Sequence, residues 1–430
     1  MKTLNRPQNP TSHDLSPNRN PSPKKNHNVF YVGLLSFFGG ISQDTFSPIL
    51  PIYYTTILGF DKTFVGVAEG LVTASSYLFA VIAGFFSDKF KKQKPIIFIG
   101  YFFSMVSRPL LAFFTSGVAV LGLRFTDGVG KGLKDPPKDV LIAGSAKKSV
   151  RGKSFGIARM LDTLGSVAGP LILFGLLSIL KGSAWLYHGI LVFSAIPLMI
   201  TLLVLIFKVK EVPKTATIAA NVNDQQTDSN QKISPASIAT PAISAPLPKA
   251  FYLFLGIVIL FTFGNSSDAF LILRAQSLGV TLLEIPLVIA LFNFIYALFA
   301  VPLGSLSDRI GRIPTMLIGW GAYALVYLGF AFASHAYMIW PLYAFYGIYY
   351  AANLGVAKAF LADIIGTDHR GRAFGIYGTA VGLATLPASF FAGFLWDKFG
   401  PVYPFCFGAI MAAFAATLLF LFSKRLSTVK

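Results

Sequence analysis

Long apolar runs separated by short polar turns fill the chain from residue 29 to residue 423. The runs are twelve, and they cover 29–54, 64–86, 95–115, 117–142, 154–177, 185–207, 250–273, 283–303, 314–333, 338–361, 373–395 and 403–423. About 20 apolar residues are needed to cross the hydrocarbon core of a bilayer, and each run reaches that length. Because backbone groups in lipid must be satisfied within their own segment, the runs predict helices. The expected fold is an all-α membrane protein with twelve transmembrane helices.

The composition supports a membrane protein and argues against several other classes. Hydrophobic residues make up 54% of the 430 residues and charged residues only 13%, against about 25% charge in soluble domains. The single cysteine, Cys406, cannot form a disulfide within the chain or a thiolate metal site. We therefore expect no metal and no cofactor. We also expect no enzyme, because no nucleophile–base pair or metal motif is recognisable.

Polar segments divide the chain into two halves. Residues 1–27 are rich in Asn, Pro, Ser and Lys and predict a disordered cytoplasmic tail. Residues 208–249 are rich in Ser, Thr, Ala, Pro, Asn and Gln and predict a flexible cytoplasmic linker. The expected domains are a six-helix bundle over 28–207, a second one over 250–423, and a cytoplasmic tail over 424–430.

Lysine and arginine sort to one side of the predicted membrane. Most of the 36 lie in the tail, the linker and the turns on the side of the N-terminus, whereas the opposite loops hold Lys62, Lys181 and Lys398. Positive residues favour the cytoplasmic side, so both termini are expected on the cytoplasmic side of the inner (cytoplasmic) membrane. The same sorting accounts for most of the net charge of +18, and no nucleic-acid partner is expected.

The two halves repeat each other. GFFSDKFKKQKP begins at Gly84 and GSLSDRIGRIP at Gly304, while RGKSFGIARMLDTLG begins at Arg151 and RGRAFGIYGTAVGLA at Arg370. The nearly constant spacing indicates a duplicated six-helix unit in parallel orientation. Duplicated halves are typical of alternating-access transporters, whose site lies between the halves near the middle of the membrane.

A first motif resembles the signature of the major facilitator superfamily between its second and third helices, G-x-x-x-D-[RK]-x-G-[RK]. Its residues here are Gly84, Asp88 and Lys89 in the first half and Gly304, Asp308 and Arg309 in the second. The first copy departs from the signature, because Lys91 stands where glycine is usual. The resemblance covers nearly all of 29–423, and it implies a cytoplasmic gate that latches in the outward-open state.

A second motif is similar to the family's helix-four pattern R-x-x-x-G-x-G, with Arg124, Gly128 and Gly130. The charged residues that follow at steps of three and four share one helical face: Arg124, Asp127, Lys131, Lys134, Asp135 and Lys138. An unpaired charge at the bilayer centre costs roughly 2.5–3.5 kcal/mol on insertion scales, so this face is expected to point into a wet cavity or at other charges. Pro136 and Pro137 are expected to end or kink the helix. The run also resembles a bacterial branch of the family with R-x-x-D-x-x-G-K-G.

A third motif matches the first part of the family's antiporter signature. Gly156, Gly165, Gly169 and Pro170 have its spacing, whereas the closing Gly-Gly is absent. The resemblance implies a transporter that exports its substrate in exchange for protons. A plain packing interface between helices would use the same residues.

Further ionisable residues lie within the apolar runs. Asp44 and Asp268 occupy matching places in the two halves, and Glu69, Arg159, Asp162 and Lys358 lie on other helices. Asp44, Glu69 and Asp268 are the candidates for proton coupling, because burial disfavours the charged form of a carboxyl group. Arg124, Asp127, Lys131, Arg159, Asp162 and Lys358 are the candidates for substrate or charge coupling in a cavity that Asp44 and Arg124 share. Structural ion pairs between helices are the alternative.

The sequence thus predicts a proton-coupled, monomeric secondary antiporter that works by alternating access and exports a small organic molecule, such as a drug-like compound, a siderophore or a metabolite. An importer or facilitator of a small anionic metabolite is the alternative, with Arg124, Lys131, Arg274 and Lys358 as the cations. A membrane sensor or scaffold is a third hypothesis.

Overall fold

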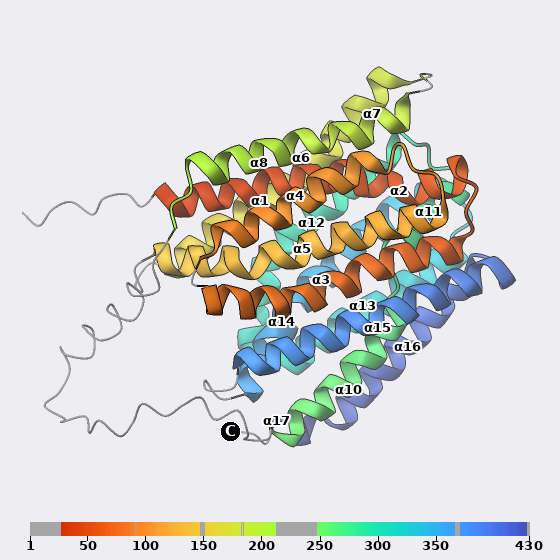
Figure 1. Ribbon diagram of the computed structural model, residues 1–430. Helices are drawn as coiled ribbons and strands as arrows, with labels where there is room; N and C mark the ends of the chain where they lie inside the picture. Colours follow the sequence, from red (N-terminus) through yellow and green to blue (C-terminus); the bar gives the residue numbers. More distant parts are fainter. Residues whose placement is uncertain are drawn as a thin grey trace, which may run out of the picture.

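The computed structural model describes residues 27–90, 92–146, 151–181, 183, 185–211, 247–365 and 370–427, and within them all regular structure is helical (Figure 1). The side chains of 88–90, 151, 152, 370 and 371 lie outside this description. So do nearly all of the predicted N-terminal tail and linker and the last three residues of the C-terminal tail. The predictions of disorder there stay predictions.

The helices of the first half coincide with its six predicted segments. They are α1 (His27–Phe46) with the short turns η1 (Ser47–Ile49), α2 (Leu50–Ile52) and η2 (Tyr53–Ile57), then α3 (Lys62–Phe90), α4 (Lys94–Leu110), α5 (Gly117–Ser145), α6 (Arg151–Leu180), and α7 (Leu186–Phe193) with α8 (Ala195–Phe207). The sixth segment is divided at Ser194, and the first changes its helical type after Phe46, where Pro48 and Pro51 follow.

The second half repeats this order. Its helices are α10 (Lys249–Gly264) and α11 (Ala269–Ser277), α12 (Glu284–Ile310), α13 (Arg312–Phe332), η5 (Ala336–Met338) leading into α14 (Ile339–Ile364), α15 (Arg370–Phe399), α16 (Val402–Leu421) and the short α17 (Ser423–Ser427). The helices of the two halves also pair alike. α3 packs on α5 as α12 packs on α14, and α1 packs on α6 and α8 as α10 packs on α15 and α16. This pairing is the one expected of a duplicated unit.

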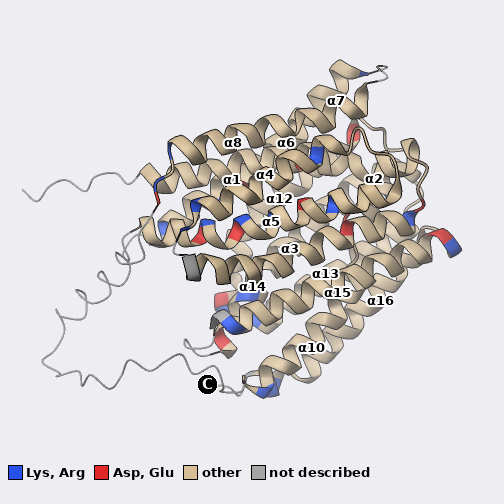
Figure 2. Cartoon of the chain, viewed as in Figure 1, with Lys and Arg blue, Asp and Glu red and all other residues tan. Residues whose placement is uncertain are grey.

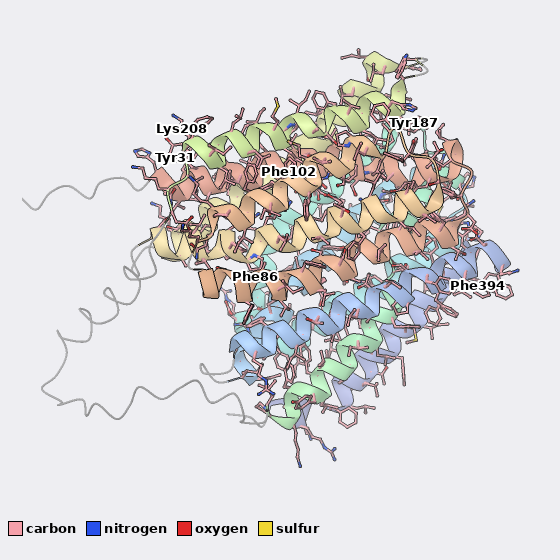
Figure 3. The ribbon with its side chains drawn as sticks, in the orientation of Figure 1. Tyr31, Phe86, Phe102, Tyr187, Lys208 and Phe394 are labelled. Carbon is pink, nitrogen blue, oxygen red and sulfur yellow. The ribbon has the colours of Figure 1, made fainter. Side chains whose placement is uncertain are left out.

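Eight helices or helix pairs in the described part of the chain are long and apolar enough to cross a membrane. α4, with 17 residues, and α5, with its charged face, are not among them. The count of twelve transmembrane helices therefore stays a prediction. Apolar side chains such as Phe102 and Phe394 stand exposed on the outside of the bundle, where lipid would solvate them (Figure 3).

The helices run between two ends of the bundle. We call the end where α8 finishes and α10 begins the linker end, and the end where α3 begins and α15 finishes the far end (Figure 1). Charged residues lie at helix termini and along α5, with long uncharged stretches elsewhere (Figure 2).

The two halves are packed closely at the far end. The carboxylate of Asp397 on α15 accepts hydrogen bonds from the backbone N–H groups of Lys62 (3.1 Å) and Thr63 (2.7 Å) at the start of α3. A Cβ on Gly66 would clash with the carbonyl oxygen of Ser389, so the α3 and α15 backbones touch there. At Gly84, Gly156 and Gly304, near the linker end, an added Cβ would meet no atom within 4 Å. These three glycines bring no backbones together.

Two helix boundaries differ from those expected. The helix α5 does not end at Pro136 and Pro137 but continues to Ser145, packed between α3 and α4, and a kink at the prolines stays a prediction. The seventh segment is broken at 265–268, between α10 and α11. The break begins where the N–H of Asn265 bonds back to Phe261 and Thr262, and it ends where the Ser267 hydroxyl accepts a hydrogen bond from the N–H of Ala269.

Candidate functional site

The charged helix α5 is wedged between α3 and α4 by its glycines. A Cβ on Gly128 would clash with the hydroxyl of Ser75 on α3, and one on Gly130 would lie 2.5 Å from the carbonyl oxygen of Gly100 on α4. The two glycines of the helix-four motif thus bring in two backbones, one on each side. This close packing turns the charged face of α5 inward, away from lipid.

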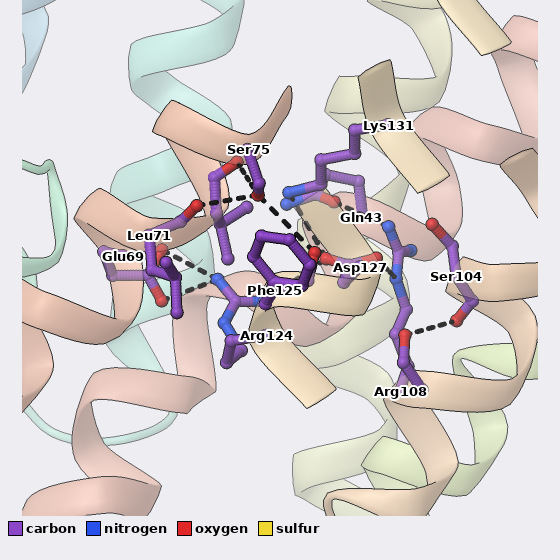
Figure 4. Close-up of polar contacts among 12 residues, drawn as sticks. Gln43, Glu69, Leu71, Ser75, Ser104, Arg108, Arg124, Phe125, Asp127 and Lys131 are labelled. Carbon is purple, nitrogen blue, oxygen red and sulfur yellow. Dashed lines mark hydrogen bonds and ion pairs between the residues drawn. The ribbon is translucent and has the colours of Figure 1, made fainter. Parts of the chain in front are cut away.

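Asp127 is the centre of a buried charge network in the first half (Figure 4). Its carboxylate pairs with Arg108 (3.0 Å), Arg124 (3.3 Å) and Lys131 (3.5 Å). The side chains of Arg108 and Arg124 are fully buried. Since an unpaired buried charge is costly, three cations around one carboxylate require a second anion nearby.

Glu69 on α3 supplies that second anion. The Arg124 guanidinium donates to both carboxylate oxygens of Glu69, at 2.8 and 2.9 Å. Both bonds come from one guanidinium nitrogen, Nη2, so the contact is a charge-assisted ion pair and not a two-nitrogen fork. Arg124 therefore lies between two carboxylates, Glu69 and Asp127, as Figure 4 shows.

Arg108 on α4 is a member of this network that the sequence analysis missed. Besides Asp127, it donates to the Ser42 hydroxyl (2.6 Å) and to the side-chain oxygen of Gln43 (2.8 Å) on α1. Its guanidinium also lies 4.5 Å from the ring centre of Phe46. The signal was present in the sequence, because Arg108 is an ionisable residue inside the apolar run 95–115.

A central cavity of about 390 Å³ lies between the two halves. Of the predicted residues, Glu69, Asp268 and Lys358 line it. Its aromatic lining consists of Tyr77, Phe261, Trp320, Tyr349, Tyr350 and Tyr377. Asp268 stands in the break between α10 and α11, and its oxygens accept hydrogen bonds from the hydroxyls of Tyr346 (2.6 Å) and Tyr350 (2.9 Å).

A second cavity of about 320 Å³ lies within the first half. It is lined by polar residues that include Asp44, Tyr101, Lys131, Lys134, Asp135, Lys138 and Asp162. Asp44 and Arg124 were expected to share one cavity, and this is wrong. Asp44 lines the second cavity, whereas Arg124 is fully buried and lines neither. The rotation of α1 turns Asp44 towards α6, where a Cβ on Gly169 would lie 2.9 Å from the Asp44 Cβ.

The charge network connects the two cavities. Glu69 lines the central cavity, and Lys131 lines the second one. Between them, Arg124 and Asp127 complete a continuous series of ion pairs, Glu69–Arg124–Asp127–Lys131. A change of charge at one cavity therefore acts electrostatically on the other through buried groups.

The remaining predicted residues have other surroundings. Arg159 pairs with Asp162 at 3.0 Å and donates to the Tyr296 hydroxyl of the second half at 2.8 Å. Gly165 and Gly169 press α6 against α1, whereas Gly156 faces open space. Asp308 pairs with Arg312, which also reaches Asp363 (3.2 Å). The side chains of Asp88 and Lys89 lie outside the described residues.

Comparison with known proteins places the chain in a family. The sequence profile of the Major Facilitator Superfamily matches residues 32–271 and 252–429. An uncharacterised MFS-type transporter of Methanocaldococcus jannaschii is 34% identical over 413 residues, which cover 94% of this chain and 97% of that protein. This chain belongs to the major facilitator superfamily. The resemblance seen in the sequence is thereby confirmed at the level of the family, while the narrower branch stays a prediction.

One further likeness covers part of the chain, and another concerns the fold. A tetracycline resistance protein, class B, of Escherichia coli is 32% identical over 123 residues, which cover 29% of this chain and 30% of that protein. The crystal structure of a bacterial homologue of the human lysosomal transporter Spinster, in an inward-facing and unoccupied conformation, superposes with a TM-score of 0.71 at 15% identity and covers 94% of this chain and 98% of that one. The protein is a multi-pass membrane transporter for small molecules rather than an enzyme.

The arrangement gives this transporter two kinds of chemistry in one site. The first half provides a carboxyl group, Glu69, whose charge is balanced by a buried arginine. The second half provides a carboxyl group, Asp268, held by tyrosine hydroxyls, and a wall of aromatic rings. Proton exchange and the binding of a small molecule can therefore occur at facing surfaces of one cavity.

Proposed function

We propose that this transporter is a proton-coupled antiporter that exports a small organic molecule across the bacterial inner membrane, as a monomer with both termini in the cytoplasm. The observation that carries the proposal is the pairing of Glu69, at the central cavity, with the buried Arg124. The partial antiporter motif on α6 and the partial likeness to a tetracycline resistance protein favour export.

Glu69 is the residue that we propose to carry the proton. When Glu69 is ionised, it accepts two hydrogen bonds from Arg124. A proton on Glu69 removes its charge and leaves Arg124 with Asp127 as its remaining anion. The charge of the central cavity wall then changes by one unit, which is large in a medium of low dielectric constant. Substrate and proton thereby compete for the same cavity.

Asp44 is the second proton-binding group of the proposal. It lines the second cavity together with Lys131, which pairs with Asp127. A proton arriving at Asp44 changes the field on Lys131 and, through Asp127, on Arg124. Asp268, the third candidate, lies in the opposite half, where two tyrosine hydroxyls donate hydrogen bonds to it.

The alternation of access would follow from the contacts at the two ends. Positive residues at the turns of the linker end, such as Lys92, Lys94 and Lys208, favour a cytoplasmic position for that end. With this orientation, the packed far end faces outward, and the halves are closed to the outside there. The motifs at Asp88 and Asp308 would latch the linker end in the opposite, outward-open state.

The test is transport into proteoliposomes with an imposed pH gradient, using candidate drug-like compounds and siderophores as cargo. We expect accumulation that collapses with the gradient, and we expect Glu69→Gln to bind cargo but to lose the response to the gradient. Asp44→Asn should weaken that response. Glu284→Gln is the matched control, since Glu284 is partly exposed at the far end and accepts hydrogen bonds from Thr281 outside both cavities. Accumulation that ignores the gradient in the parent protein contradicts the proposal.

A further inference from the structure

The walls of the central cavity are unevenly charged. Asp268 and Glu69 are its two acidic residues. The charge of Glu69 is balanced by Arg124, which holds both of its oxygens. Asp268 has no ion pair among the described residues, and its oxygens accept hydrogen bonds from two tyrosine hydroxyls instead. Its residue is also exposed, so its carboxylate is available to a molecule in the cavity.

Few cationic side chains line the central cavity. Arg124 is buried behind Glu69, and Lys131 opens into the second cavity. Arg274 donates to the carbonyl oxygens of Phe330, Ala331 and Ala333 at 2.7–3.2 Å, and does not line the cavity. Of the four cations that anion transport would use, only Lys358 lines the central cavity, towards the linker end of α14.

Aromatic rings line the central cavity, and Tyr350 both lines it and donates to Asp268. Phe261, Trp320 and Tyr349 are at most 3% exposed and form the layer behind the surface. The lining rings with accessible area are those of Tyr77, Tyr350 and Tyr377. Ring faces attract cations within about 6 Å of the centroid, and they also offer apolar area to a flat or bulky body. The central cavity therefore contains both a carboxylate without a cationic partner and accessible aromatic rings.

We propose that the central cavity recognises an organic cation with an aromatic or bulky apolar body, whose positive group binds Asp268 and whose body packs against Tyr77, Tyr350 and Tyr377. The inference rests on the proposed function of the same cavity and names its class of substrate. It disfavours the small anion of the alternative function, because the unpaired carboxylate of Asp268 would repel an anion, and Lys358 is the single cationic residue among the described residues that line the cavity. The hydroxyls of Tyr346 and Tyr350 orient the Asp268 carboxylate for the cation.

The test is equilibrium binding to the purified full-length protein at fixed pH, without any gradient. The probes are tetraphenylphosphonium and its anionic counterpart of the same shape, tetraphenylborate, together with phenethylammonium as a smaller amine. We expect saturable binding of the cations and no displacement by tetraphenylborate. Asp268→Asn should weaken cation binding by about tenfold or more, since it removes one partner of a charge pair in a partly desolvated site. Glu284→Gln should bind as the parent protein does.

A second variant keeps the inference testable if Asp268→Asn does not fold. Lys358 is exposed and has no ion pair among the described residues, so Lys358→Gln should fold. We expect this variant to bind tetraphenylphosphonium more tightly, because a repulsive charge is removed. Weaker cation binding in Lys358→Gln, stronger binding of tetraphenylborate than of the cation, or no saturable binding of either cation overturns the inference. Cation binding with transport that ignores the pH gradient refutes the coupling and leaves the substrate class standing.

Discussion

The helices α5 and α14 hold corresponding places in the two halves, and they carry opposite chemistry. Each packs against the second helix of its half, α3 or α12. On α5, the inward residues include Arg124, Asp127 and Lys131, which form ion pairs. On α14, the corresponding stretch carries four tyrosines, Tyr343, Tyr346, Tyr349 and Tyr350. One half is thus built for charge and the other for rings and hydroxyls.

The comparison suggests a division of labour in a duplicated fold: one copy can provide proton coupling and the other substrate recognition. Charge on α5 is stable only because α4 contributes Arg108 and α3 contributes Glu69. No such partners are needed by α14, whose tyrosines hold Asp268 by neutral hydroxyls. A charged group needs partners in fixed places, whereas a tyrosine can satisfy a carboxylate at little cost in burial.

The largest effect should follow from Asp127→Asn. This change leaves Arg108, Arg124 and Lys131 with one anion fewer in a buried place. Breaking a buried charge network costs about 3–5 kcal/mol of unfolding free energy. The thermal midpoint of the detergent-solubilised protein should therefore fall strongly. Asp162→Asn is the control, because its pair with Arg159 is exposed and is worth about 1 kcal/mol or less. An equal fall of the thermal midpoint in the two variants would show that the buried network contributes no more to stability than the exposed Arg159–Asp162 pair.

A smaller effect is expected where the two halves meet. Gly393 on α15 packs against the start of α3, and a Cβ there would lie 2.6 Å from the Thr63 Cα. Gly393→Ala should destabilise the packed far end by about 1–3 kcal/mol. Labelling of a cysteine introduced in the central cavity from the far side should rise, once Cys406 has been replaced. Gly321→Ala on α13 should change nothing, since its Cβ would meet open space. Unchanged labelling in Gly393→Ala would show that this contact does not hold the halves together.

Arg124→Lys tests whether proton coupling needs the geometry of the Arg124 guanidinium or only its charge. Lysine keeps the charge, but its single nitrogen cannot replace the two nitrogens, Nη2 and Nη1, by which Arg124 holds Glu69 and Asp127 at once. We expect proton-driven transport to fall about tenfold, which corresponds to about 1.4 kcal/mol. Binding of cargo to the second half should stay close to that of the parent. Parent-like transport by this variant would mean that the charge of Arg124 alone is sufficient.

The smallest effect belongs to the tyrosines. The Tyr323 hydroxyl donates to the carbonyl oxygen of Gly264, at the last residue of α10. Tyr323→Phe should lower the unfolding free energy by about 1 kcal/mol, the typical net value of one hydrogen bond. Chemical or thermal unfolding in detergent measures it. A loss as large as that of Asp127→Asn would show that the tyrosine half depends on single polar contacts as strongly as the charged half does.

Several features of the site could be predicted from the sequence, and others could not. The charged face of α5 followed from the spacing of its residues, and the need for burial followed from their charge. The break at 265–268 was missed. Its four polar residues lie inside the apolar run 250–273, and no proline in that run signals the end of a helix. The cavity of Asp44 was also misjudged. Which side of α1 faces α6 depends on the fit of Gly40, Gly165 and Gly169, and this fit is a contact between distant segments.

By itself, the sequence determined that helices cross a membrane in two repeated halves, because apolar length and the repetition of motifs are local properties of the chain. Only the tertiary structure decided which charges meet. Glu69, Arg108, Arg124 and Asp127 come from three helices, and their pairing depends on how each helix is rotated about its axis. That rotation is set by side chains packing across the bundle, and no periodicity along a single helix contains it.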